Sequence, residues 1–100
     1  MNIKIQSVHF DADTKLLDFI EQKLNKLDQY HENIIDAEVY LRLDKAENSE
    51  NKVADIKLLV PGSDLFSKRH AKTFEEAIDH ATEVLTRQLK KLKEKQIAKK

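Results

Sequence analysis

The chain of 100 residues contains no cysteine, no tryptophan, and only one glycine and one proline. Without cysteine it can form no disulfide, no thiolate nucleophile and no cysteine-ligated zinc site. Apolar residues never run for as many as seven positions, and the polar residues Asn2 and Lys4 lie close behind the initial methionine. These features argue against a signal peptide or a membrane-spanning helix. With 36% charged residues, we expect a soluble cytoplasmic protein.

Motifs of catalysis and metal binding are also missing. The sequence has no H-E-x-x-H zinc motif, no G-x-S-x-G nucleophile turn, no phosphate-binding loop and no dinucleotide fingerprint. Glu75 and Glu76 are neighbours, but adjacent helix positions do not face one another, so they do not form an acid–base pair. The histidines lack the spacing of metal ligands; they are His9, His31, His70 and His80. We expect no enzyme, and therefore no catalytic residue, metal, cofactor or small-molecule substrate.

The length is that of one domain, and the hydrophobic pattern divides it into six elements. Alternating apolar residues predict strands, and apolar residues at three- and four-residue steps predict helices. Asp13 is placed to cap the first helix, and Thr73 and Glu76 have the spacing of a capping box before the second. We predict strands at residues 2–6, 37–43, 53–60 and 65–72, and helices at residues 14–30 and 73–95. The predicted single domain covers residues 1–95, followed by a frayed basic tail at residues 96–100.

The order of elements is β-α-β-β-β-α, which places the chain in the α+β class. A strand–helix–strand start predicts a right-handed crossover and a parallel pair, and the following hairpins add antiparallel strands. Each helix has one apolar stripe and the sheet has one apolar face. Both helices should therefore pack side by side on one face of a four-stranded mixed sheet. The other face should stay in water, with Tyr40 as its one aromatic residue, although the weak alternation in residues 65–72 leaves the inward side of that strand undecided.

The formal net charge is zero, yet charge is strongly separated along the last helix. Its first half, residues 73–86, carries four acids and no lysine or arginine. Residues 87–100 carry seven basic residues against one acid, Glu94. Two interpretations remain open. Clustered positive charge is typical of a phosphate-binding surface, but acids at the start and bases at the end of a helix also complement its macrodipole.

A cationic surface is predicted where the two helices meet, because basic residues recur on a flank of each one at three- and four-residue steps. Side-by-side helices would join these flanks across a groove and hold several phosphates without reading bases. Tyr30 lies next to the first flank, where it either stacks at the rim or closes the edge of the core. The candidate RNA-binding residues are Lys23, Lys26, Tyr30, Arg87, Lys90, Lys91, Lys93 and Lys95.

Two common RNA-binding modules fit this pattern poorly. An RNA-recognition motif stacks bases on aromatic residues of its sheet, but the predicted strand at residues 53–60 has none. A double-stranded-RNA-binding domain has the order α-β-β-β-α with lysines at the start of its last helix, where this chain is acidic. The helices are therefore the predicted binding surface.

Both helices carry sequence runs that occur together in a known family. These runs are Lys23-x-x-Lys26-Leu27-x-x-Tyr30 and Phe74-x-x-Ala77-Ile78-Asp79, the second continued by Leu85-x-Arg87-Gln88-Leu89-x-Lys91-x-Lys93-x-Lys95. Together with Ile3, Ile5 and Asp55 in the strands, they resemble the bacterial ribosome hibernation-promoting factor and ribosome-associated translation inhibitor family. The resemblance covers the whole chain in the same element order.

The resemblance implies a protein that occupies the small ribosomal subunit in slow growth, against its rRNA near the decoding centre. Translation would stop because mRNA and tRNA are occluded. Carried over by position, the implied RNA contacts are Lys23, Lys26, Arg87, Lys91, Lys93 and Lys95, whereas Lys90 and Tyr30 are candidates from their placement alone. The chain resembles the short form of the family and is expected to be a monomer when free. Short forms either pair ribosomes with a separate partner or leave single ribosomes inactive.

A function of another class also remains open. The chain could be a protein–protein regulator, such as a modulator of a sigma factor, a role once attached to this family. The contact would then be the exposed sheet face or Leu59.

Overall fold

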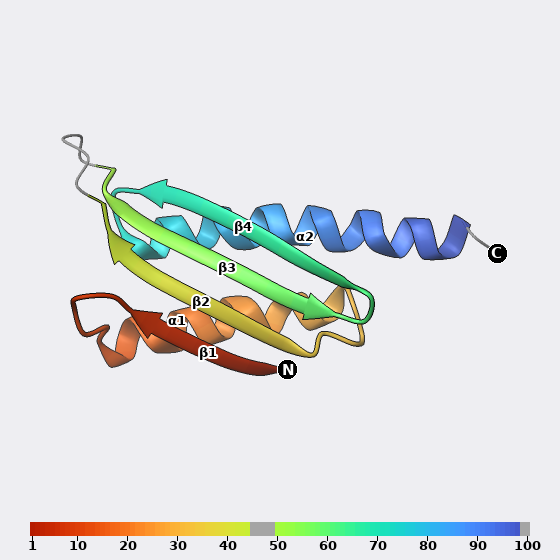
Figure 1. Cartoon of the computed structure of the whole chain (residues 1–100), viewed down its shortest axis with the longest axis horizontal. Coiled ribbons are helices and arrows are strands. Elements are labelled where there is room, and N and C mark those ends of the chain that lie inside the picture. Colours follow the sequence, from red (N-terminus) through yellow and green to blue (C-terminus); the bar gives the residue numbers. More distant parts are fainter. Residues whose placement is uncertain (45–49, 99–100) are drawn as a thin grey trace.

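The described residues, 1–44 and 50–98 with side chains up to residue 94, form four strands and two α-helices in the computed structural model (Figure 1). The elements are β1 (Asn2–Ser7), α1 (Thr14–Asn25), a short 3-10 helix η1 (Lys26–Gln29), β2 (Asp36–Leu43), β3 (Lys52–Val60), β4 (Ser63–Ala71) and α2 (Phe74–Ala98). The predicted β-α-β-β-β-α order is confirmed. The predicted first helix is α1 and η1 together, ending where the Tyr30 N–H donates to the Leu27 carbonyl at 3.0 Å.

The sheet has the strand order β1-β2-β3-β4. β1 pairs with β2 in parallel, and the two following pairs are antiparallel, as predicted. The register places Ile5, Val39, Ile56 and Ser67 in one row across all four strands. Because side chains alternate between the faces of a strand, this row fixes which residues of each strand face the helices.

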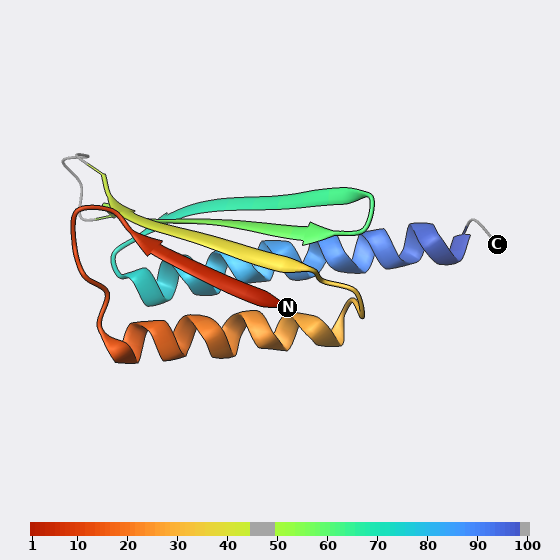
Figure 2. The same ribbon diagram turned by 60° about the horizontal axis from the view of Figure 1, so that its bottom comes forward.

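Both helices cover the same face of the sheet, so the molecule has two layers (Figure 2). The core lies between these layers and joins the apolar stripe of each helix to the inward rows of the strands. Its largest fully buried side chains are Ile20, Leu24, Leu27, Val39, Leu41, Ile56, Leu58, Ile78, Leu85 and Leu89. The predicted arrangement of two helices on one face is confirmed.

Side-chain caps fix where both helices begin. The Leu16 N–H donates to Asp13 Oδ1 at 2.8 Å, which confirms Asp13 as the N-cap of α1. At the start of α2 the Glu76 N–H donates to Thr73 Oγ1 at 3.1 Å, so the Thr73 half of the predicted capping box is present. Each cap satisfies a backbone donor that the first helical turn leaves without a partner.

The structure shows which side of β4 faces the helices, a point that the sequence left undecided. Pro61 and Gly62 form the tight turn before it, with Gly62 at φ +78°, a conformation that glycine adopts without steric cost. Ser67 faces inward and is 4% exposed, while Phe66 faces outward and is 55% exposed. Tyr40 is therefore not the only aromatic residue on the open sheet face; that prediction was wrong. The polar Ser67 on the inward face and the aromatic Phe66 on the outward face reverse the usual placement of polar and apolar residues in a strand. This reversal is the reason why the alternation of apolar residues in the sequence was weak.

α2 is longer than any other element and extends beyond the sheet at its C-terminal end (Figure 1). Its 25 residues span about 37 Å. The basic half of the helix begins alongside the sheet, where Gln88 Nε2 donates to the Phe66 carbonyl at 3.3 Å and Leu89 is fully buried, and only the last turns project. The predicted tail at residues 96–100 stays a prediction, and its last two residues lie outside the described part of the chain. Among the described residues, no helix combines the length and apolar character that crossing a membrane requires.

Ile56 tests whether the core holds the two layers together. It is fully buried in the central strand β3, so Ile56→Ala should lower the free energy of unfolding by about 3–4 kcal/mol through lost burial and a cavity. Its neighbour Lys57 is exposed on the opposite face, so Lys57→Ala should change that free energy by less than about 1 kcal/mol. Urea unfolding of both variants measures the difference. Equal effects would contradict the assigned register.

Candidate nucleic-acid interface

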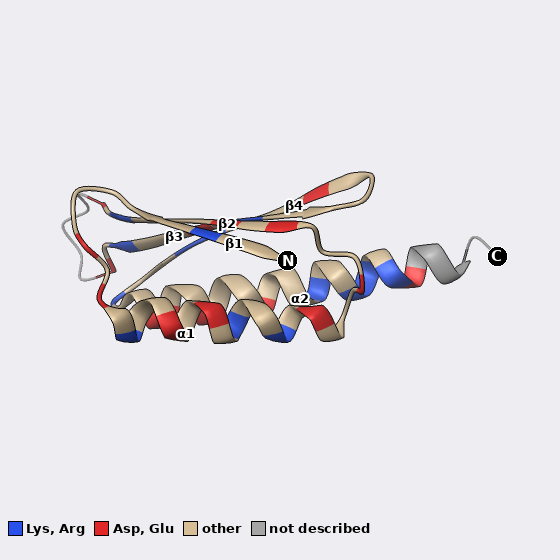
Figure 3. Cartoon of the chain, turned by 90° about the horizontal axis from the view of Figure 1, so that it is seen from below, with Lys and Arg blue, Asp and Glu red and all other residues tan. Residues whose placement is uncertain are grey.

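A shallow groove of about 380 Å³ runs between α1 and α2 on the helix side of the molecule. Figure 3 shows the two helices side by side with charged residues along both of them. The groove is lined from the first helical segment by Lys23, Lys26, Leu27 and Tyr30, and from α2 by Asp79, Thr82, Glu83 and Thr86. Three predicted RNA-binding residues therefore share this groove with two acids.

Lys23 bridges the two helices. Its Nζ donates a hydrogen bond to Asp79 Oδ1 at 2.6 Å, and the two side chains are 30% and 56% exposed. The same Nζ lies 5.7 Å from the centroid of the Phe19 ring. A partly exposed pair of this kind adds little stability, but it cancels positive charge at this end of the groove. In the unbound chain Lys23 therefore contributes little net charge to a phosphate-binding surface.

Two threonines line the middle of the groove beside Glu83, and both use their hydroxyl protons within α2. Thr82 Oγ1 donates to the Ile78 carbonyl at 2.9 Å, and Thr86 Oγ1 donates to the Thr82 carbonyl at 2.9 Å. Such back-bonding to the preceding helical turn is common for threonine inside a helix. Along this part of α2, from Asp79 to Thr86, the sequence has no lysine or arginine.

Positive charge gathers at the far end of the groove around Tyr30. Lys26 lines the groove beside Tyr30, Lys90 Nζ lies 5.3 Å from the centroid of the Tyr30 ring, and Lys93 lines a second hollow that Tyr30 shares. We call Lys26, Lys90 and Lys93 the basic end of the groove. All three lysines are exposed, and none of them forms an ion pair within the part of the chain whose side chains are described. Three of the predicted RNA-binding lysines therefore lie next to Tyr30.

The second hollow, which we call the terminal pocket, opens where η1 ends. It encloses about 250 Å³ and is lined by Gln29, Tyr30, His31, Glu32, Asn33 and Lys93. His31 is held in place because its Nδ1 accepts a hydrogen bond from the Asn33 N–H at 3.0 Å. Sequence reasoning missed this pocket, since residues after Tyr30 showed no periodicity and were treated as the end of a helix. The signal was an aromatic residue, Tyr30, followed by three polar residues.

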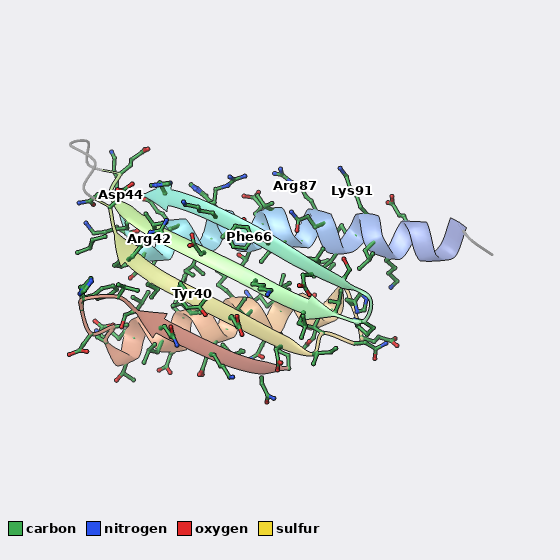
Figure 4. The ribbon with its side chains drawn as sticks, in the orientation of Figure 1. Tyr40, Arg42, Asp44, Phe66, Arg87 and Lys91 are labelled. Atoms are coloured by element: carbon green, nitrogen blue, oxygen red, sulfur yellow. The ribbon has the colours of Figure 1, made fainter. Side chains whose placement is uncertain are left out.

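Arg87 and Lys91 lie elsewhere. Figure 4 shows them projecting from α2 beyond β4, on the side away from α1. Arg87 also lies 3.7 Å from Glu83 Oε1, although both side chains are more than 60% exposed. We call Arg87 and Lys91 the outer edge.

The expected single cationic ridge is therefore divided into two sets. Successive helical residues turn by about 100°, so Lys90 and Lys91 cannot share one face. Lys26, Lys90 and Lys93 converge on Tyr30, whereas the outer edge is a separate surface. Lys95 lies in α2, but its side chain is outside the described part of the chain. Among the described residues, no three histidine or acidic side chains are grouped so that they could hold a metal ion.

Known proteins share both the sequence and the fold. The chain is 40% identical over 78 residues to the ribosome hibernation promotion factor of Deinococcus radiodurans, covering 76% of this chain and 40% of that protein. It is 34% identical over 97 residues to the Bacillus subtilis protein of the same name, covering 95% of this chain and 50% of that one. The chain thus spans about half the length, or less, of these two relatives.

A solved structure agrees with the described fold. The N-terminal domain of Thermus thermophilus Protein Y superposes with a TM-score of 0.80 at 28% identity, over 92% of this chain and 99% of that domain. Residues 3–97 match the profile of the family described as Sigma 54 modulation protein / S30EA ribosomal protein. With the match spanning nearly every residue, this chain belongs to the Sigma 54 modulation protein / S30EA ribosomal protein family.

Proposed function

We propose that this chain is a ribosome hibernation factor that binds small-subunit rRNA near the decoding centre and inhibits translation by occluding mRNA and tRNA. The observation that carries the proposal is the basic end of the groove, where Lys26, Lys90 and Lys93 meet at Tyr30. Exposed lysines without carboxylate partners are the groups that neutralise phosphates and release counterions. The names of the Deinococcus radiodurans and Bacillus subtilis relatives support a ribosomal partner.

The shape of the molecule supports occlusion as the mechanism. The chain measures 49 × 25 × 18 Å, and α2 projects from one end of it (Figure 1). A projecting basic helix can enter an RNA-lined channel, while the two-layer body fills the space behind it. Inhibition then requires no chemical step, which agrees with a sequence that has no catalytic motif. The small ribosomal subunit is the proposed partner, and the protein is proposed to act in the cytoplasm.

Reversing the basic end should abolish ribosome binding. The triple variant Lys26→Glu, Lys90→Glu and Lys93→Glu replaces attraction to phosphate by repulsion, so affinity for small subunits should fall by about a hundredfold or more at low salt. Co-sedimentation over a salt series measures this. For the unmodified chain the logarithm of the binding constant should fall linearly with the logarithm of salt concentration, by roughly 0.7–0.9 for each phosphate contact.

A matched control is available on the open sheet face. Lys4→Glu, Lys57→Glu and Lys68→Glu make the same change in net charge at exposed positions on the opposite side of the sheet. This control should bind with nearly the affinity of the unmodified chain. If both triple variants lose binding equally, net charge and not the groove would account for it, and the proposed surface would be wrong.

The outer edge should contribute a smaller, separate share. Arg87→Glu with Lys91→Glu should weaken binding about tenfold at low salt, because two exposed cations are reversed while the basic end remains. The fold-loss of affinity from this double variant should multiply with the fold-loss from a single change in the basic end, because the free-energy effects of separate sites add. Fluorescence anisotropy with labelled protein and small subunits measures the affinity of the double variant and of its combination with a single change in the basic end. Unchanged affinity would remove Arg87 and Lys91 from the contact surface.

The open sheet face favours one alternative, a protein–protein regulator such as a sigma-factor modulator. Its charges are partly satisfied internally, with Arg42 3.2 Å from Asp55 and Lys57 3.7 Å from Asp64. Phe66 is 55% exposed on the same face, and protein interfaces are enriched in aromatic residues. Pull-down from lysate with and without nuclease separates the two functions, since a protein partner survives removal of RNA.

A further inference from the structure

The terminal pocket differs in chemistry from the phosphate-binding surface beside it. The basic end presents lysines, whereas the pocket combines one of them, Lys93, with an aromatic ring, an imidazole, two carboxamides and the Glu32 carboxylate. A carboxylate disfavours a phosphate group, so the pocket is unsuited to a second backbone contact. Planar rings with hydrogen-bonding edges fit this set of groups much better.

The walls of the pocket are held in place by the unbound chain. Tyr30 ends η1, where its N–H donates to the Leu27 carbonyl at 3.0 Å, and its ring lies under Lys90 with 5.3 Å between Nζ and the centroid. His31 is fixed by the Asn33 N–H, which donates to its Nδ1 at 3.0 Å. In the tautomer that accepts this bond, the His31 Nε2 carries the proton and remains a donor. Both rings are therefore oriented before any ligand arrives.

We infer that the terminal pocket holds a single unstacked nucleobase, whose phosphate is held by Lys93 and the neighbouring lysines. The ring would stack on Tyr30 or His31, as unpaired bases stack on aromatic side chains in single-stranded RNA recognition. Gln29 and Asn33 supply amide donors and acceptors for the edge of the base. The inference rests on the proposed function and adds a base contact to a surface that otherwise binds only phosphates.

Glu32 sets the preference among bases. A carboxylate only accepts hydrogen bonds and has two oxygens. Guanine presents two adjacent N–H donors on its Watson–Crick edge, an N–H and an amino group, and so matches both oxygens. The pocket is therefore assigned to guanine in preference to uracil, which has one donor between two acceptors. The base can come from an RNA strand or from a free nucleotide, and the experiment distinguishes these sources.

The experiment compares labelled single-stranded uridine oligonucleotides about ten nucleotides long, with a central guanosine, a central uridine or a central abasic site. The full chain should bind the guanosine oligonucleotide about tenfold more tightly than the abasic one. Tyr30→Leu should remove that difference with little effect on abasic binding. Because Tyr30 borders the core, Glu32→Gln at an exposed position is the second variant; it should remove the preference for guanosine over uridine.

Nuclear magnetic resonance gives a direct readout that a purely structural role would not produce. The side-chain amide signals of Gln29 and Asn33 should shift with the guanosine oligonucleotide and stay in place with the abasic one. Guanosine monophosphate added alone identifies the source: the same shifts at comparable concentration point to a free nucleotide, and weaker shifts point to RNA.

Failure of this inference is distinguishable from failure of the proposed function. If guanosine and abasic oligonucleotides bind equally with a steep salt dependence, and guanosine monophosphate shifts no pocket signal, the base pocket is wrong while phosphate binding stands. If the unmodified chain binds neither RNA nor small subunits and guanosine monophosphate shifts no pocket signal, both are wrong.

Discussion

The burial of one apolar sheet face is the constraint on which the rest of this structure depends. Val39 and Ile56 lie in the inward row of the two central strands and are almost completely buried under the helices. The sheet has no second apolar face, so α1 and α2 must share this one and come to lie side by side (Figure 2). The groove, its basic end and the terminal pocket all follow from that shared position.

The two interpretations of the charged helix prove compatible. Acids near the start of α2 and lysines near its end complement the helix macrodipole, as the first interpretation holds. The exposed acid Asp79 pairs with Lys23 across the two helices, whereas Lys90 and Lys93 stay exposed next to Tyr30 without an ion pair among the described side chains. Neutral total charge therefore coexists with a local positive surface, because along α2 most of the acids lie near the start and the lysines near the end.

Features that depend on local periodicity could be predicted from the sequence. Features that depend on the rotation of a helix about its axis, or on the geometry of a loop, were missed. Strands, helices and the Asp13 cap follow from short-range patterns, and they are confirmed. The direction of Arg87 depends on how α2 is rotated against the sheet, which a count of basic residues does not reveal. The exposure of Phe66 on the open sheet face was not predicted, because the polar residue Ser67 occupies the inward position next to it. The terminal pocket depends on the tightened turn of η1, which has no sequence period of its own.

The central claim is that the helix layer, and not the sheet, meets ribosomal RNA. Electron cryo-microscopy of the chain bound to the small subunit tests it most directly. The account predicts rRNA phosphates within ion-pair distance of Lys26, Lys90 and Lys93, with Tyr40 and Phe66 facing away from that RNA. A complex in which rRNA covers the open sheet face and leaves the groove in solvent would contradict it.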